Sequence, residues 1–270
     1  MSTAAITPGI AHDQFIAIIA HELRYPLVPI RNAAALLKRD LTDAEAIRRA
    51  ADIIERQVSG MHRLIGDLVD VSSMQMGTLE LRRVRAPLNE LMERAVESAG
   101  PFASERGHTL SMSVAPGPIY LDMDVLRLVQ ALHQVITNAT KYTDRHGHIV
   151  VRAQREGAEV VITVSDTGIG IPDGELESIF GLFVHSGQAG VEQGLGLGLY
   201  LARYLIEAHQ GTVVAASAGP HLGSVFTIRL PCEPSSCEEQ SRELPMSAPL
   251  AALESRAEIA EASSADPSRA

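Results

Sequence analysis

The stretch FIAIIAHELRYPLVPIRNAAALL, residues 15–37, decides how the N-terminal part of the chain folds. Its apolar residues recur at alternating steps of four and three positions, which is the heptad period of helices packed in a bundle or coiled coil. The residues of this seam are Ile16, Ala20, Leu23, Leu27, Ile30, Ala34 and Leu37. The spacing predicts one long helix, from about residue 11 to residue 39.

A histidine with an adjacent carboxylate lies near the middle of this helix. His21 directly follows a seam residue, so it lies about 100° around the helix and points away from the packed seam. Glu22 is also off the seam, and Pro26 should kink or loosen the helix by clashing with the carbonyl of residue 22. This arrangement suits a phosphoryl acceptor, although the stretch alone fits an ordinary surface histidine of a bundle helix better.

A second helix should follow a tight turn at residues 40–45, where Thr42 and Glu45 have the spacing of a capping box. It carries two heptad rows of apolar residues, Ile47, Ile54, Met61 and Leu68 in one and Ala51, Val58 and Ile65 in the other. Two long helices joined by a short turn form a hairpin. A hairpin alone leaves such rows exposed, so the sequence predicts a homodimer whose two hairpins make a four-helix bundle.

The pattern changes after this hairpin, which we assign to residues 11–76 behind a lead-in at residues 1–10. Residues 77–85 read as a linker. Residues 86–231 then mix expected helices with expected strands, which predicts an α/β sandwich of one mixed sheet under helices. The helices are expected at 87–98, 122–142 and 197–209, and the strands at 109–114, 149–155, 160–165, 212–217 and 224–230. The fold class is therefore α+β.

The remaining segment, residues 232–270, holds seven Glu and one Asp against three Arg and reads as an acidic, mostly disordered tail.

The whole chain has 46% hydrophobic residues, 4% aromatic residues and a net charge of −10, which argues against nucleic-acid binding. No apolar run approaches the roughly 18 residues of a membrane span, and the N-terminus lacks the features of a signal peptide. With only Cys232 and Cys237, the chain has too few cysteines for a disulfide framework, so we expect a cytoplasmic protein.

Three local signals in the second half carry chemistry. The first is Asn138-Ala-Thr-Lys141-Tyr142 at the end of an expected helix. The Asn138 amide oxygen suits Mg²⁺ or its waters, Lys141 can reach phosphates, and Tyr142 can cover a flat base. Standing alone, this segment would be read as a polar helix end.

The second signal, Asp166-Thr-Gly168-Ile-Gly170, directly follows an apolar strand. A carboxylate at a strand end, followed by glycines that let backbone approach a ligand closely, suits hydrogen bonding to a purine amino group.

The third signal is Gly194-Leu-Gly196-Leu-Gly198, which opens an expected helix whose positive end favours anions. A polar loop precedes it, and residues 212–218 hold no acid, so it does not fit a dinucleotide-binding fold. The chain also has no G-x-x-x-x-G-K-[ST] run, which excludes a P-loop.

In this order, the His21-Glu-Leu-Arg-x-Pro-Leu segment, the Asn138 segment, the Asp166 segment, two phenylalanines and the Gly194 segment resemble the sensor histidine kinases of two-component signalling. The resemblance covers roughly residues 11–231. It implies a dimeric phosphoacceptor hairpin followed by a Bergerat-type ATP-binding domain. It also implies that ATP phosphorylates His21, with Glu22 as the base, and that the phosphoryl group passes to an aspartate on a response regulator receiver domain.

The resemblance assigns nucleotide-binding roles position by position. Asn138 would hold Mg²⁺ together with Gln134, Lys141 would contact phosphate, and Tyr142 would line the nucleotide. Asp166 would accept a hydrogen bond from the adenine amino group. The glycines expected to shape this wall and to form the hinge and rim of a lid over about residues 181–194 are Gly168, Gly170, Gly194, Gly196 and Gly198.

Four features depart from the family pattern. Gln134 stands where the family usually has an Asn, and no Lys or Arg lies between Gly181 and Gly198, so we expect slow catalysis. Tyr25 replaces the Thr or Asn that positions water for phosphatase activity, which predicts a poor phosphatase. No sensor or receiver domain is recognisable, so the sequence is a fragment or receives its input from a separate partner.

Two other functions stay open at this point. A weakly active or degenerate kinase could serve as a dimeric scaffold that binds a regulator, and Gln134 and the lid motivate this alternative. A stand-alone ATPase of the wider superfamily would hydrolyse ATP without using His21.

Overall fold

The computed structural model describes residues 19–21, 23–39, 43–184 and 195–232. The predictions for the lead-in, for Glu22 and Gly194, for most of the lid and for nearly all of the tail lie outside these residues. In the part that the structure describes, every helix is too short or too polar to cross a lipid bilayer.

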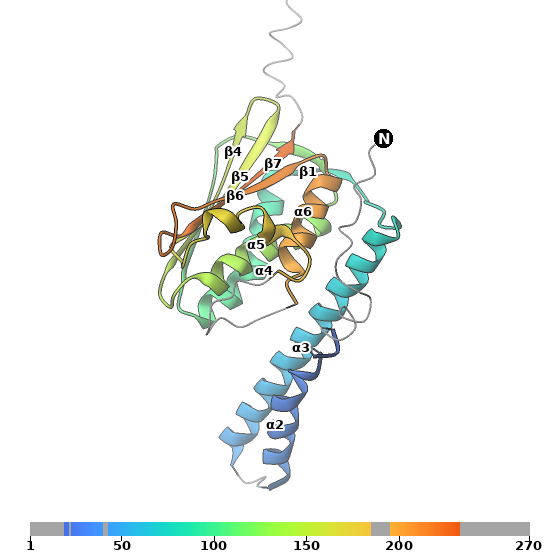
Figure 1. Cartoon of the computed structure of the whole chain (residues 1–270), viewed down its shortest axis with the longest axis vertical. Coiled ribbons are helices and arrows are strands. Elements are labelled where there is room, and N and C mark those ends of the chain that lie inside the picture. Colours follow the sequence, from blue (N-terminus) through green and yellow to red (C-terminus); the bar gives the residue numbers. More distant parts are fainter. Residues whose placement is uncertain (1–18, 22, 40–42, 185–194, 233–270) are drawn as a thin grey trace, which may run out of the picture. The chain divides into compact units, whose positions relative to one another are not determined.

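Two helices, α2 (Leu27–Arg39) and α3 (Ala44–Gln75), form the predicted hairpin (Figure 1). The described residues from 19 to 24 are also helical, and Tyr25 and Pro26 form a turn between them and α2. The backbone amide of Tyr25 still donates to the carbonyl of His21 at 3.2 Å. The predicted break at Pro26 is therefore confirmed, and it comes one helical turn after the histidine.

Asp43 caps the start of α3, whereas Thr42, the cap expected from the sequence, lies outside the described residues. The Asp43 carboxylate accepts from the backbone amides of Glu45 at 2.9 Å and Ala46 at 3.0 Å. The Glu45 side chain accepts a hydrogen bond from the Arg49 guanidinium one turn on, at 2.9 Å. A carboxylate at this position accepts hydrogen bonds from the free backbone amides of the first helical turn. Its negative charge also interacts favourably with the positive end of the helix dipole.

The C-terminal domain contains a five-stranded mixed sheet in the order β2-β4-β5-β7-β6. Strands β2 and β4 are parallel, and the other neighbours are antiparallel. The strands are β2 (Thr109–Val114), β4 (His148–Glu156), β5 (Glu159–Asp166), β6 (Thr212–Ala216) and β7 (Ser224–Pro231). Buried and more exposed side chains alternate along β4 and β7, so one face of the sheet is covered and the other faces solvent.

Three helices cover the buried face of this sheet, α4 (Leu88–Glu105), α5 (Val125–Tyr142) and α6 (Gly198–Ala208) (Figure 1). Two short 3-10 turns, η1 (Asp173–Glu175) and η2 (Ser178–Phe180), lie between β5 and α6. Both layers contribute to the largest fully buried side chains, which include Leu91, Leu128, Ile136, Ile149, Ile162, Leu205 and Phe226. The predicted α/β sandwich after a helical hairpin is confirmed.

Two elements differ from the sequence prediction. The strand β3 (Tyr120–Met123) pairs with β1 (Val84–Pro87) in a separate two-stranded sheet, so the helix expected from residue 122 begins only at Val125. Helix α4 continues through Gly100 and Pro101, where the prediction ended it. It continues because Ala99 and Ala103 are buried on its core face, at 0% and 2% exposure.

The segment that leads from the hairpin into this domain is held by Asp124 and His209. The Asp124 carboxylate accepts from the backbone amide of Arg82 at 2.8 Å, and the Arg83 guanidinium donates to the carbonyl of Ala208. The buried His209 ring lies 2.7 Å from the Leu205 carbonyl through Nδ1, and its Nε2 accepts from the backbone amide of Asp124 at 3.0 Å. This pattern requires a neutral ring with its proton on Nδ1.

Stability should therefore fall in mild acid through His209. Burial lowers the pKa of His209, so the unfolded chain binds more protons than the folded chain once the pH drops below the ordinary histidine value. Below about pH 6.5 this histidine should cost up to about 1.4 kcal/mol of unfolding free energy per pH unit. Urea unfolding of the wild type and of His209→Gln across this range should show a shallower pH dependence in the variant. Equal slopes would contradict the assignment.

Candidate active site

A cavity of about 980 Å³ lies between α5, the end of β5, the start of α6 and the helical hairpin. The predicted site residues that line it are His21, Gln134, Asn138, Lys141, Tyr142, Asp166, Gly170, Gly196 and Gly198. Gly168 is buried directly beside this wall. The structure thus brings together predicted site residues that are up to 177 positions apart in the sequence, from His21 to Gly198.

Asp166 ends β5 and is fixed by several donors. Its Oδ1 accepts from the backbone amides of Gly168 at 2.8 Å and Ser224 at 3.2 Å, and its Oδ2 accepts from the Ser224 hydroxyl. Each carboxylate oxygen can accept more than one hydrogen bond, so the fixed group can still receive a donor from a ligand. An oriented acceptor of this kind suits an exocyclic amino group of a flat base.

The loop after Asp166 is braced by the loop between β6 and β7. The backbone amide of Gly223 donates to the carbonyl of Gly168 at 3.0 Å, and the amide of Ile171 donates to the Ser217 hydroxyl at 3.1 Å. Gly170 has a φ of +72°, and a Cβ at this position would come within 2.1 Å of the Gly219 carbonyl oxygen. The approach of the two loops therefore requires a glycine at this position.

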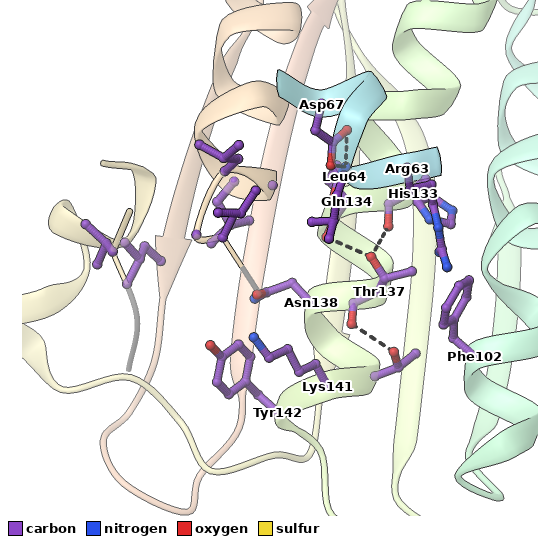
Figure 2. A pocket seen from close by; sticks show the side chains of 18 of the residues that line it. Arg63, Leu64, Asp67, Phe102, His133, Gln134, Thr137, Asn138, Lys141 and Tyr142 are labelled. Atoms are coloured by element: carbon purple, nitrogen blue, oxygen red, sulfur yellow. Dashed lines mark hydrogen bonds between the residues drawn. The ribbon is translucent and has the colours of Figure 1, made fainter. Parts of the chain in front are cut away.

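Helix α5 supplies the opposite wall. Asn138, Lys141 and Tyr142 extend from its last turns toward the cavity (Figure 2). The Lys141 ammonium lies 5.0 Å from the centroid of the Tyr142 ring, within cation–π range. These three side chains place an amide, a cation and an aromatic ring along one edge of the cavity. An amide, a positive charge and a flat apolar surface are the groups that a metal-bound nucleotide needs.

Gln134 lies one helical turn before Asn138, and its side chain forms hydrogen bonds with α3. Its Nε2 donates to both carboxylate oxygens of Asp67 on α3, at 3.2 Å each (Figure 2). Burial is the main cause that raises the pKa of Asp67 to about 6. Of the two residues predicted to hold Mg²⁺, Gln134 therefore has its amide nitrogen engaged by α3.

His133 lies next to Gln134 on the side of α5 that faces α4. Its Nδ1 is 3.0 Å from the Ser98 hydroxyl, and its ring meets Phe102 edge to face at a centroid distance of 5.6 Å. Burial, and secondarily the charge of Arg63, lower the pKa of His133 to about 4, so the ring is neutral near pH 7. It serves as a packing residue between helices.

His21 is exposed and lines the cavity from the hairpin side, together with Tyr25 and the buried Pro26. Tyr25 is 74% exposed. The exposed imidazole predicted from its position off the apolar seam is therefore present, one helical turn before the helix is interrupted. Its expected base, Glu22, lies outside the described residues.

Two site residues escaped the sequence analysis. Ser224 pairs with Asp166 across β5 and β7, and Asp67 contacts Gln134 from α3. Ser224 follows a glycine turn before a predicted strand, but its role depends on the strand register, which the sequence alone does not give. Asp67 lies between two apolar heptad rows and carries no local signal of its own.

Comparison with known proteins agrees with this geometry. Residues 11–77 match the family model described as the His Kinase A (phospho-acceptor) domain. Residues 123–234 match the model described as the histidine kinase-, DNA gyrase B- and HSP90-like ATPase. The chain belongs to the sensor histidine kinase family.

Curated and solved histidine kinases are similar to this chain over most of its length. The autoinducer 2 sensor kinase/phosphatase LuxQ of Vibrio vulnificus is 32% identical over 84% of the chain. The crystal structure of full-length ShkA in complex with AMPPNP is 27% identical, covers 84% of the chain and has a TM-score of 0.59. The structure of histidine kinase ThkA in complex with the response regulator protein TrrA, at 22% identity, 83% coverage and a TM-score of 0.60, shares the fold.

The chain covers only part of these kinases. It spans 27% of LuxQ, 46% of the ShkA chain and 62% of the ThkA chain. What is shared is the hairpin and the ATPase-like domain, which together hold every described site residue.

Replacement of Gly170 should test the wall that the two loops form. Gly170→Ala should destabilise the fold by about 2–4 kcal/mol, because a side chain would be strained at this φ and would clash with the Gly219 carbonyl. Gly174→Ala is the matched control, since a Cβ at that position meets nothing within 4 Å. Urea unfolding of both variants measures the difference, and equal midpoints would show that the loop adjusts without cost.

Proposed function

We propose that this chain is an ATP-dependent protein-histidine kinase that phosphorylates its own His21 and passes the phosphoryl group to an aspartate of a response regulator. The observation that carries the proposal is the cavity itself. His21 of the hairpin lines the same cavity as Asn138, Lys141 and Asp166 of the ATPase-like domain. The acceptor and the groups suited to a nucleotide thus face one space.

Each wall of the cavity has a role in this proposal. Asp166 accepts from the adenine amino group, and Tyr142 covers the base. Lys141 contacts phosphate. Asn138 holds Mg²⁺, which neutralises phosphate charge when bound. The fixed donors on Asp166 support its role, because they orient the carboxylate before any ligand arrives.

The transfer step involves both nitrogens of His21. The unprotonated ring nitrogen forms a bond to the γ-phosphorus of ATP. The bond from that phosphorus to the β,γ-bridging oxygen breaks, and ADP leaves with the electron pair. The proton on the other ring nitrogen passes to Glu22, the base expected from the sequence, so the product is a neutral phosphoimidazole ring.

The partners in this proposal are a second copy of the chain and a receiver domain. Apolar side chains on the hairpin remain exposed on the single chain: Leu27, Val28, Leu36, Val58, Ile65 and Val69. A four-helix bundle of two hairpins would cover such rows. The ThkA structure contains a response regulator protein in complex with a histidine kinase of this fold, which supports a regulator as the second partner.

The scaffold alternative rests on a specific contact. Gln134 is engaged with Asp67, and the lid sequence offers no Lys or Arg to a γ-phosphate. A chain of this kind could bind nucleotide and a regulator without rapid phosphorylation. Autophosphorylation separates the two functions.

The first experiment is incubation with γ-labelled ATP and Mg²⁺, comparing the wild type with His21→Gln. The wild type should acquire acid-labile, alkali-stable label, because a phosphorus–nitrogen bond hydrolyses in acid. His21→Gln should acquire none while binding ADP as tightly as the wild type. Nucleotide binding by a wild type that takes up no label would favour the scaffold alternative.

Nucleotide affinity tests the assigned role of Asp166. Asp166→Asn replaces one acceptor oxygen by a donor, so ADP affinity should fall by about tenfold to a hundredfold, or about 1.4–3 kcal/mol. Glu159→Gln, at the other end of the same strand, is the matched control and should bind as the wild type does. Calorimetry on the folded variants gives both values, and unchanged affinity in Asp166→Asn would remove this residue from the base site.

A further inference from the structure

Two acids of α3 face a row of polar side chains on α5. Asp67 and Asp70 are three positions apart and so share one face of α3. Asp70 accepts from the Arg127 guanidinium at 2.8 Å and from the Gln130 amide at 2.7 Å, and Asp67 accepts from Gln134. We call these five residues the α3–α5 clasp.

An apolar cluster lies beside the clasp. Val71 of α3 packs with Leu195 and Leu197, which precede α6, and all three are at most 3% exposed. Leu64 and Leu68 of α3 and Phe183 add partly buried contacts. The contact between α3 and the ATPase-like domain therefore combines buried apolar surface with a row of directed hydrogen bonds, as specific interfaces do.

The length of the Gln134 side chain suits the clasp. On one side its Nε2 reaches Asp67 at 3.2 Å, and on the other its Oε1 lies so close to α6 that a Cβ on Gly198 would come within 2.6 Å. An asparagine is one methylene shorter, by about 1.5 Å, and would not span the same gap. The departure from the family pattern at this position is thus matched by a partner on α3.

On these contacts, and resting on the proposed kinase function, we propose that the clasp holds the ATPase-like domain against the hairpin of its own chain, so that this domain phosphorylates that chain's His21. We call this arrangement of the domain on its own hairpin the seat. In this proposal Gln134 is a positioning residue of the clasp and does not bind the metal. The seated arrangement is the productive one, because His21 and Asp166 line a single cavity within one chain. Transfer requires reacting atoms to lie close together and aligned, so loss of the seat should slow the reaction and leave nucleotide binding intact.

A charge exchange across the clasp tests the seat. Asp70→Arg and Arg127→Asp should each lower the kcat of autophosphorylation by about tenfold or more at saturating ATP, and the double variant should recover most of it. ADP affinity should stay within about twofold of the wild type throughout. Asp52→Arg, at an exposed position of the same helix, is the matched control and should leave both values unchanged. Full activity of the single variants, or no recovery in the double variant, would overturn the proposal.

Hydrogen exchange measures the seat without catalysis. Amides at residues 64–71 and 195–200 should exchange faster in Asp70→Arg than in the wild type, and the charge exchange should restore their protection. Equal exchange in all variants would overturn the seat even if the wild type took up no label. Absence of label with a protected interface would instead count against the proposed kinase function.

The metal role of Gln134 is tested by nucleotide binding with Mg²⁺ and with a chelator. Gln134→Ala should keep the gain in affinity that Mg²⁺ gives, whereas Asn138→Ala should lose it. Loss of the gain in Gln134→Ala would return this residue to the metal site and overturn its assignment to the clasp.

Phosphorylation within one chain is tested by mixing wild-type chains with an excess of a tagged His21→Gln/Asp166→Asn double variant, at an ATP concentration too low to fill the weakened Asp166→Asn site. The label per wild-type chain should stay constant, because each wild-type chain carries both halves of its own site. A fall in this label as the excess grows would show transfer between chains and overturn the intrachain assignment.

Discussion

The site depends on a carboxylate that is fixed at the end of a strand. Asp166 holds its position because β5 pairs with β7 in the register that sets Asp166 opposite Ser224, and because the following turn returns the amide of Gly168 to the same oxygen. Without that register, Ser224 and Gly168 would leave unpaired polar groups in a partly buried wall, which is costly. The β6–β7 loop and the glycine turn after Asp166 are shaped by this requirement.

Helix α5 divides its circumference between the core and the site. Leu128, Leu132 and Val135 are at most 2% exposed and pack under the sheet. On its other faces, Asn138 and Lys141 extend toward the cavity, and Arg127, Gln130 and Gln134 reach α3. Because an α-helix returns to the same side every three or four residues, one rigid element can align both sets. The position of α3 and the position of the nucleotide groups are therefore linked through a single helix.

Much of this architecture could be predicted from periodicity and from residues with strong backbone preferences. The heptad seam around His21, the interruption at Pro26 and the alternation along β4 are local properties, so they were readable without a structure. The strand β3 was not, because four residues give too short a pattern and Asp122 resembled a helix start. The continuation of α4 through Pro101 was missed because burial of Ala99 and Ala103 outweighs the local signal.

The candidate site could likewise be predicted only where its residues stand in local sequence patterns. Asn138, Lys141, Tyr142 and Asp166 stand in local patterns that point to a nucleotide. Ser224 and Asp67 become part of the site only through strand register and helix packing, which no local pattern contains. Gln134 shows the consequence, since the family resemblance assigns it to a metal, whereas its long-range contact is with Asp67 of α3. Phosphoryl transfer depends on positioning and on charge stabilisation. A lid sequence without Lys or Arg would supply less charge stabilisation, so in the proposed reaction the contacts that position the domain gain weight.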